Sequence, residues 1–110
     1  MVKCFLNVSY DEQRSRLLAR LDDPTKHWKF NAGDIKERGH WADYQDAYLD
    51  ALTKCSTDAA PWYSIPSDRK WYRNWAVSRI LLETLRDMNV RYPDVDLDIP
   101  ALKKRLAPPN

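Results

Sequence analysis

The fold is decided by residues 14–44, which read RSRLLARLDDPTKHWKFNAGDIKERGHWADY. Two helical patterns occupy the ends of this stretch, and a short connector between them is rich in cations and aromatic rings. Positive charge is supplied by Arg14, Arg16, Arg20, Lys26, His27, Lys29, Lys36 and Arg38, and flat apolar area by Trp28, Phe30, Trp41 and Tyr44. A basic segment of this kind between helices suits a flap that closes over a polyanion.

The first helical pattern starts after Ser9 and ends at the Asp22-Asp23-Pro24 sequence. Ser9 and Glu12 form a capping box, in which each side chain can satisfy the backbone amide of the other residue. The connector that follows, residues 25–30 (TKHWKF), has neither helical nor strand periodicity, so we predict an ordered loop. Asn31 is a favourable N-cap, and it predicts one long helix over residues 32–53.

Two apolar runs predict strands, and a third helical pattern follows the second run. Residues 2–8 (VKCFLNV) indicate a strand covered on both faces, and residues 61–65 (PWYSI) indicate a second strand between prolines. Ser67 is expected to cap a helix over residues 68–88, with Trp71 and Trp75 on its buried stripe. The order strand, helix, helix, strand, helix predicts an α/β fold with two short parallel strands and three main helices. A two-stranded parallel sheet is rare alone, so the chain is expected to be part of a larger sheet.

The composition excludes several classes of protein. The 18 Lys and Arg residues against 16 Asp and Glu leave a net charge of +2, which predicts neither a nucleic-acid partner nor a membrane partner. Cys4 and Cys55 lack metal-ligand spacing, and Met1 is followed by no apolar run of signal or spanning length. We therefore expect a cytoplasmic chain with reduced thiols.

Glycine use limits the ways in which phosphate can be bound. The chain has two glycines, Gly33 and Gly39, so the pattern G-x-x-x-x-G-K-[ST] of a phosphate loop is impossible. No Asp follows a strand in the way that the magnesium site of such kinases requires. Any phosphate must then be held mainly by side chains.

Four motifs together indicate a family. They are FLNVS-x-x-EQ from Phe5, RLDDPxKxWKF from Arg20, Asp34 and Arg38 ahead of W-x-x-Y, and APWYxIPSDRKW from Ala60. In this order they resemble the C-terminal part of the second polyphosphate kinase family, over about residues 4–85. Members of that family move phosphoryl groups between inorganic polyphosphate and nucleotides.

The resemblance implies the C-terminal part of a P-loop kinase-like, three-layer fold. Residues 1–90 would be the C-terminal half of a polyphosphate kinase domain with a helical lid at about residues 20–40, and residues 91–110 a peripheral tail. Family members carry a phosphate loop and a magnesium-binding acid upstream of the region seen here. Magnesium is thus expected for the complete enzyme and not for this chain alone. The expected partners are inorganic polyphosphate, a nucleotide of the ADP or AMP type, and a second copy of the chain or an upstream half-domain.

The candidate phosphate-binding residues lie in and beside the implied lid. They are Arg16, Arg20, Lys26, Lys29 and Arg38, with Asp68 and Lys70 as possible supporting residues. Arginine can form paired hydrogen bonds with phosphate oxygens, and lysine acts as a point charge. The alternative for the cluster is a solvated helix face with ion pairs such as Arg16 with Glu12, and the alternative for Asp68 is to favour a helix N-terminus. We predict no catalytic residue and no metal ligand in the chain.

Two functions remain open from the sequence. The first is a fragment of a polyphosphate:nucleotide phosphotransferase that is incomplete for catalysis. The second is a non-catalytic module that binds a polyanion or docks another chain through an open strand edge and its surplus aromatic side chains.

Overall fold

The computed structural model describes residues 1–109, and its elements follow the predicted order. The strands are β1 (Lys3–Asn7) and β2 (Trp62–Pro66), and the α-helices and one 3₁₀ helix are α1 (Tyr10–Asp22), η1 (Pro24–Lys29), α2 (Gly33–Arg38), α3 (Trp41–Lys54), α4 (Lys70–Asp87) and α5 (Ile99–Leu106). The predicted α/β class with two parallel strands is confirmed. None of the helices in residues 1–109 is both long and apolar enough to cross a membrane.

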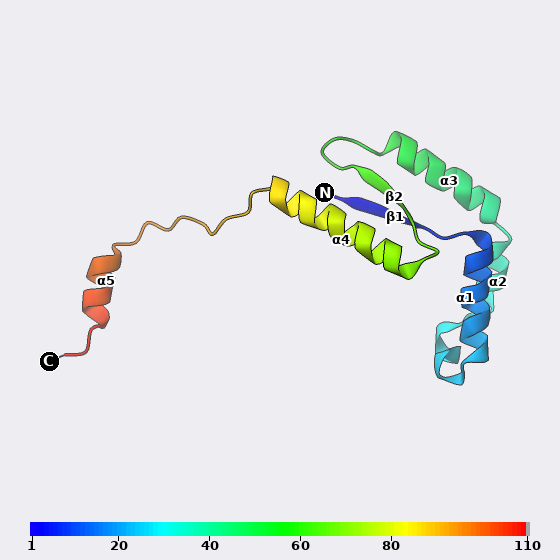
Figure 1. Ribbon diagram of the computed structural model, residues 1–110, viewed down its shortest axis with the longest axis horizontal. Helices are drawn as coiled ribbons and strands as arrows, with labels where there is room; N and C mark the ends of the chain where they lie inside the picture. The colour runs from blue at the N-terminus through cyan, green and yellow to red at the C-terminus, as the bar shows by residue number, and fades with distance from the viewer. Residues whose placement is uncertain (110) are drawn as a thin grey trace.

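Within residues 1–109, β1 and β2 form a two-stranded parallel sheet whose register places Phe5 opposite Ser64 and Leu6 opposite Ile65. Side chains alternate between the faces of a strand. Phe5 packs on Tyr48 of α3, with 4.4 Å between ring centroids. Lys3 lies on the same face, and its Nζ donates a hydrogen bond to the carbonyl oxygen of Cys55 at the end of α3. The strands run between α3 and α4, as Figure 1 shows.

The buried interior is small. Among residues 1–109, Ile65 is the one buried apolar residue, with 3% of its surface exposed, and Ser67 is the one buried polar residue, with 1% exposed. The prediction that β1 is covered on both faces is wrong, because Leu6 is 45% exposed. The radius of gyration is 24.0 Å, against roughly 13 Å for a compact chain of this size.

The helices α1, η1 and α2 project from the strands, and we call residues 10–38 the projecting arm (Figure 1). The expected loop at residues 25–30 is instead η1, because Pro24 begins it and the Asp23 carboxylate accepts a hydrogen bond from the Thr25 amide. The expected single helix over residues 32–53 is divided into α2 and α3. Gly39 and His40 donate to carbonyls three residues back, which tightens the last turn of α2 and ends it.

The face of α4 that is partly buried is not the face that carries Trp71 and Trp75. Tyr72, Val77 and Ile80 are partly buried, whereas Trp71 and Trp75 are 66% and 55% exposed. The buried stripe predicted for these two tryptophans is therefore wrong in this chain. Helical period identifies an apolar face but cannot say whether another segment covers it. Beyond α4, residues 89–98 form neither helix nor strand, and α5 lies away from the sheet (Figure 1).

Candidate functional site

The first turn of α1 is joined to the turn between β2 and α4. Ser9 Oγ accepts a hydrogen bond from the Glu12 amide at 3.2 Å, which is half of the predicted capping box. The other half is changed: the Ser9 amide donates to Asp68 Oδ1 at 2.7 Å, and Glu12 instead pairs with Arg16. The expected role of Ser67 as the cap of the third main helix is wrong, because Arg69 is the N-cap of α4, and the Asp68 carboxylate bonds to the start of α1. The Ser67 hydroxyl donates to the carbonyl of Ile65, and the Asp68 carboxylate serves α1.

Arg16 strengthens the same junction from the second turn of α1. Its Nε donates to Glu12 Oε1 at 2.8 Å, and its Nη2 donates to the carbonyl oxygens of Ser67 at 2.8 Å and Asp68 at 3.0 Å. The ion pair with Glu12, which the sequence offered as the alternative to phosphate binding, is present, and it holds the guanidinium in the orientation that reaches both carbonyls. Arg16 thus connects segments more than 50 positions apart in the chain.

Arg38 holds α2 against α1. Its Nη1 donates to Gln13 Oε1 at 2.6 Å and to the Tyr10 carbonyl oxygen at 3.2 Å. The guanidinium carbon lies 3.9 Å from the centroid of the Tyr10 ring, within the range of a cation–π contact. Tyr10 is supported in turn by an edge-on contact with Trp41.

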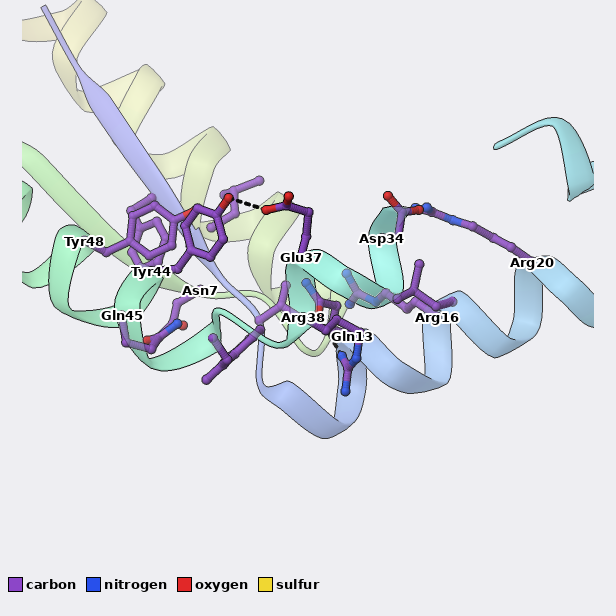
Figure 2. A pocket seen from close by; sticks show the side chains of 15 residues that line it. Asn7, Gln13, Arg16, Arg20, Asp34, Glu37, Arg38, Tyr44, Gln45 and Tyr48 are labelled. Carbon is purple, nitrogen blue, oxygen red and sulfur yellow. Dashed lines mark hydrogen bonds between the residues drawn. The ribbon is translucent and has the colours of Figure 1, made fainter. Parts of the chain in front are cut away.

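A cavity of about 560 Å³ opens between α1, α2, α3 and the end of β1. Three of the predicted cations line it, namely Arg16, Arg20 and Arg38, together with the carboxylates Asp34 and Glu37. Figure 2 shows the side chain of Arg20 reaching from α1 toward Asp34 on α2. The two carboxylates offset part of the positive charge of the arginines that line the same cavity.

The opposite wall of the cavity is polar and aromatic. Tyr44 donates its hydroxyl to Glu37 Oε2 at 2.6 Å, the hydrogen bond drawn in Figure 2. This bond to a carboxylate raises the pKa of Tyr44 above its usual value, so the phenol stays protonated. The contact ties α2 to α3 across the Gly39–His40 break.

The lysines of η1 lie outside the cavity wall. Lys26 pairs with Asp23 at 3.0 Å, and Lys29 Nζ lies 5.0 Å from the centroid of the Trp28 ring. Hydrogen bonds from the side chains of Thr25 and Lys26 lower the pKa of Asp23 to about 2. A His27 ring nitrogen donates to the Leu21 carbonyl oxygen at 2.7 Å, which holds η1 on the end of α1.

The predicted site residues therefore fall into three groups. Arg16, Arg20 and Arg38 share one cavity, while Lys26 and Lys29 extend the positive surface along η1. Asp68 lines a second cavity of about 500 Å³ at the ends of both strands, and Lys70 is the first residue of α4.

Sequence reasoning missed the residues that hold the cations in place. Tyr10 and Gln13 secure Arg38, and Asp34 and Glu37 line the same cavity as the arginines. Gln13 was present in the motif FLNVS-x-x-EQ, but its partner is 25 positions away, so no local spacing could reveal the contact. The three-residue spacing of Asp34 and Glu37 on one helix was a visible signal.

The motif order and this geometry agree with comparisons with known proteins. A family model described as Polyphosphate kinase 2 matches residues 1–93. The chain belongs to the polyphosphate kinase 2 family. The match includes both strands, the projecting arm, α3 and α4.

Two curated relatives have informative names. An AMP/ADP-polyphosphate phosphotransferase from Meiothermus ruber is 53% identical over 93 residues, which are 84% of this chain and 35% of the relative. An ADP-polyphosphate phosphotransferase from Rhodopseudomonas palustris is 44% identical over 106 residues, which are 96% of this chain and 36% of the relative. The chain thus spans about a third of the length of these family members.

A solved structure shares the fold. The crystal structure of polyphosphate kinase 2 from Arthrobacter aurescens TC1 superposes with a TM-score of 0.87 at 48% sequence identity. The alignment covers 96% of this chain and 38% of that chain. The arrangement of sheet and projecting arm is therefore the arrangement found in a polyphosphate kinase 2 crystal structure.

Proposed function

We propose that this chain forms the polyphosphate-binding part of a polyphosphate:nucleotide phosphotransferase, in which the projecting arm acts as the lid. The observation that supports this most directly is the cavity lined by Arg16, Arg20 and Arg38, with further lysines on η1. The relatives named as AMP/ADP- and ADP-polyphosphate phosphotransferases suggest the second substrate, a nucleotide of the AMP or ADP type.

The cations suit a linear polyanion better than a single phosphate. Polyphosphate presents closely spaced negative oxygens, so cations arranged along an arm can each contact a successive unit. Arg20 and Arg38 would bind phosphate oxygens in the cavity, and Lys26 and Lys29 would continue the contacts along η1. Arg16 has Nε and Nη2 already engaged, which leaves its Nη1 for a phosphate oxygen. During phosphoryl transfer, the same cations would stabilise charge on the moving group.

The remaining catalytic parts are proposed to come from residues outside this chain. Its two glycines cannot form a phosphate loop. Among residues 1–109, no group of three or more His, Cys, Asp or Glu side chains is placed to hold a metal ion. The magnesium that the family resemblance implies would be held by residues outside this chain, and it would offset the negative charge of the phosphates. Lys70 and Asp68 would support the site without contacting the reacting group.

Binding and catalysis can be tested separately on the purified chain. We expect a fluorescent polyphosphate of about 20 units to bind, because several cations then act together, and to be released by salt. Arg20→Ala should weaken binding by about tenfold, as for the loss of a charge-assisted phosphate contact. Arg91→Ala, on the segment after α4, is the matched control and should bind normally. Equal losses for Arg20→Ala and Arg91→Ala would show non-specific attraction and contradict the site.

Catalysis by the chain alone is expected to be absent. Incubation with polyphosphate, magnesium and ADP or AMP should yield no ATP or ADP above background, measured by nucleotide chromatography. A stoichiometric mixture with an independently expressed upstream segment of a family member should restore transfer. Transfer by the 110-residue chain alone would disprove its incompleteness.

A second candidate function is a binding or assembly module without catalysis. It is favoured by the edge of β1 that faces away from β2, which carries no strand within residues 1–109, and by the exposed Trp71 and Trp75. Such an edge can pair with a second copy or with an upstream half-domain. Sedimentation velocity would separate the cases: self-association at micromolar concentration supports docking between copies, and a monomer that binds only the upstream segment supports a split enzyme.

A further inference from the structure

The junction between α1 and the turn at Ser67 and Asp68 does more than connect two segments. Three hydrogen bonds cross it: Ser9 amide to Asp68 Oδ1, and Arg16 Nη2 to the carbonyl oxygens of Ser67 and Asp68. The turn is itself fixed to the sheet, because the Ser67 amide donates to the Asn7 carbonyl oxygen at 2.8 Å. Ser67 is the most buried residue of the described chain, so this end of the junction is the rigid one.

We propose that Asp68 is a positioning residue that sets the angle of α1, and thereby the placement of the cations of the projecting arm over the ends of the strands. It acts through the Ser9 amide and contacts neither polyphosphate nor nucleotide. This inference rests on the proposed function only where it concerns polyphosphate; the orientation of α1 is a property of the chain itself.

The length of α1 explains why a change at Asp68 displaces the cations at the far end of the helix. An α-helix rises 1.5 Å per residue, so α1 is about 20 Å long. A tilt of about 10° at its first turn moves its far end by about 3 Å. Arg20 and the lysines of η1 are near that far end. Because a binding group must be held within about 0.5 Å of its working position, a small change at Asp68 is enough to misplace them.

A carboxylate such as that of Asp68 suits the contact with the start of α1. A negative group at the start of a helix is favoured by the helix dipole and by the free amides of the first turn. The hydrogen bond from the Ser9 amide lowers the pKa of Asp68, because it favours the carboxylate form that accepts the bond. Glu12, the residue that would close an ordinary capping box, is engaged with Arg16. The Ser9 hydroxyl still caps the Glu12 amide, but the Ser9 amide is satisfied by a residue 59 positions away, and this ties the start of α1 to the sheet.

The orientation of α1 can be measured directly by pulsed electron paramagnetic resonance. Spin labels would be placed at Asp22→Cys, on the far end of α1, and at Ser78→Cys, on α4, with Cys4 and Cys55 changed to Ser. We expect one narrow distance distribution for the chain with Asp68. Asp68→Ala should broaden it, and Asp68→Asn, which keeps an oxygen acceptor, should remain narrow. Asp58→Ala in an exposed loop is the matched control and should change nothing.

Binding provides the second readout. Asp68→Ala should weaken polyphosphate binding by about two- to tenfold, the change that corresponds to one hydrogen bond, and Asp68→Asn should restore most of it. An Asp68→Ala distribution as narrow as that of the unmodified chain would overturn the proposal. So would an Asn variant as broad as the Ala variant. If the unmodified chain fails to bind polyphosphate, the proposed function fails, while the distances still decide the role of Asp68.

The donor side of the hydrogen bond gives an independent test if Asp68→Ala does not fold. Ser9 has φ −67°, a value that proline adopts without strain. Ser9→Pro removes both the amide donor and the hydroxyl cap, whereas Ser9→Ala removes the hydroxyl alone. We expect a broader distance distribution for Ser9→Pro than for Ser9→Ala. Equal widths for the two variants would overturn the positioning role.

Discussion

The two ends of α1 are held in different ways. At the near end, Ser9 and Arg16 bond to residues more than 50 positions along the chain, next to the most buried residue of the described structure. At the far end, Asp23 and His27 bond to residues within six positions of themselves. Long-range contacts fix direction, and local contacts fix only the shape of the turn. The projecting arm is thus oriented at its base, residues 9–16, and shaped at its tip, residues 23–29, an arrangement that suits the proposed role of the tip in binding.

The largest expected effect is on stability at the base. Arg16→Ala removes the hydrogen bonds to two carbonyl oxygens and leaves Glu12 without its partner. We expect the free energy of unfolding in urea to fall by about 2 kcal/mol. Arg20→Ala, one turn further along α1, should cost less than about 0.5 kcal/mol. Similar losses for both variants would mean that the two ends are held equally well.

A smaller effect is expected at the contact of Arg38 with the first turn of α1, which joins α2 to α1. A double-mutant cycle with Arg38→Ala and Gln13→Ala should give a coupling energy of about 1 kcal/mol, measured by urea unfolding. The reason is the charge-assisted hydrogen bond of 2.6 Å between these side chains. Arg38→Ala combined with Gln45→Ala, on α3, is the comparison pair. A coupling energy near zero for Arg38 with Gln13 would contradict a structural role for their contact.

At the tip, we expect an effect on binding without an effect on stability. Lys26→Ala and Lys29→Ala should each weaken polyphosphate binding by about threefold at low salt, and this difference should shrink as salt screens the charges. Their unfolding midpoints in urea should match that of the unmodified chain, since exposed ion pairs contribute little. Lys54→Ala at the end of α3 is the control for a lysine with a similar ion pair. A lowered unfolding midpoint for either tip variant would remove the distinction between base and tip.

The smallest expected effect is a pH response confined to the tip. The pKa of Asp23 is about 2 in the folded chain, below its ordinary value of 3.8. The stabilisation it provides is therefore fully present above about pH 4 and is lost as the pH falls toward 2. The Thr25 amide resonance should follow this titration by NMR, and Asp23→Asn should abolish it. A Thr25 amide that titrates near pH 4 would show that the local hydrogen bonds do not hold the Asp23 carboxylate.

Local features of the fold were predictable from the sequence because their causes are local. The cap by Ser9, the pairing of Arg16 with Glu12 and the order of strands and helices depend on neighbours within a few positions. The split at Gly39 was not predicted, because Asn31 and the later apolar period fit one continuous helix as well as two. The contacts of Arg38 and Tyr44 on either side of the break favour two helices over one.

The candidate site was predictable in residue type and only partly in arrangement. The order of cations in residues 14–44 identified the arginines that share the cavity. It could not show that Arg16 also binds two carbonyls or that Asp68 replaces Glu12 in the cap. These contacts join residues more than 50 positions apart, and no spacing rule reaches that far.

The unpaired indole nitrogen of Trp62 on β2 affects the stability of the fold. Its Nε1 is buried and has no hydrogen-bond acceptor within residues 1–109. An unpaired buried donor costs about 1–3 kcal/mol. If docking of another segment moved the indole so that its Nε1 met a carbonyl oxygen, that energy would be recovered only in the folded chain, and folding and assembly would become linked equilibria. The melting temperature of the chain would then rise with the concentration of that segment, and the folded chain would be most stable where the segment is abundant.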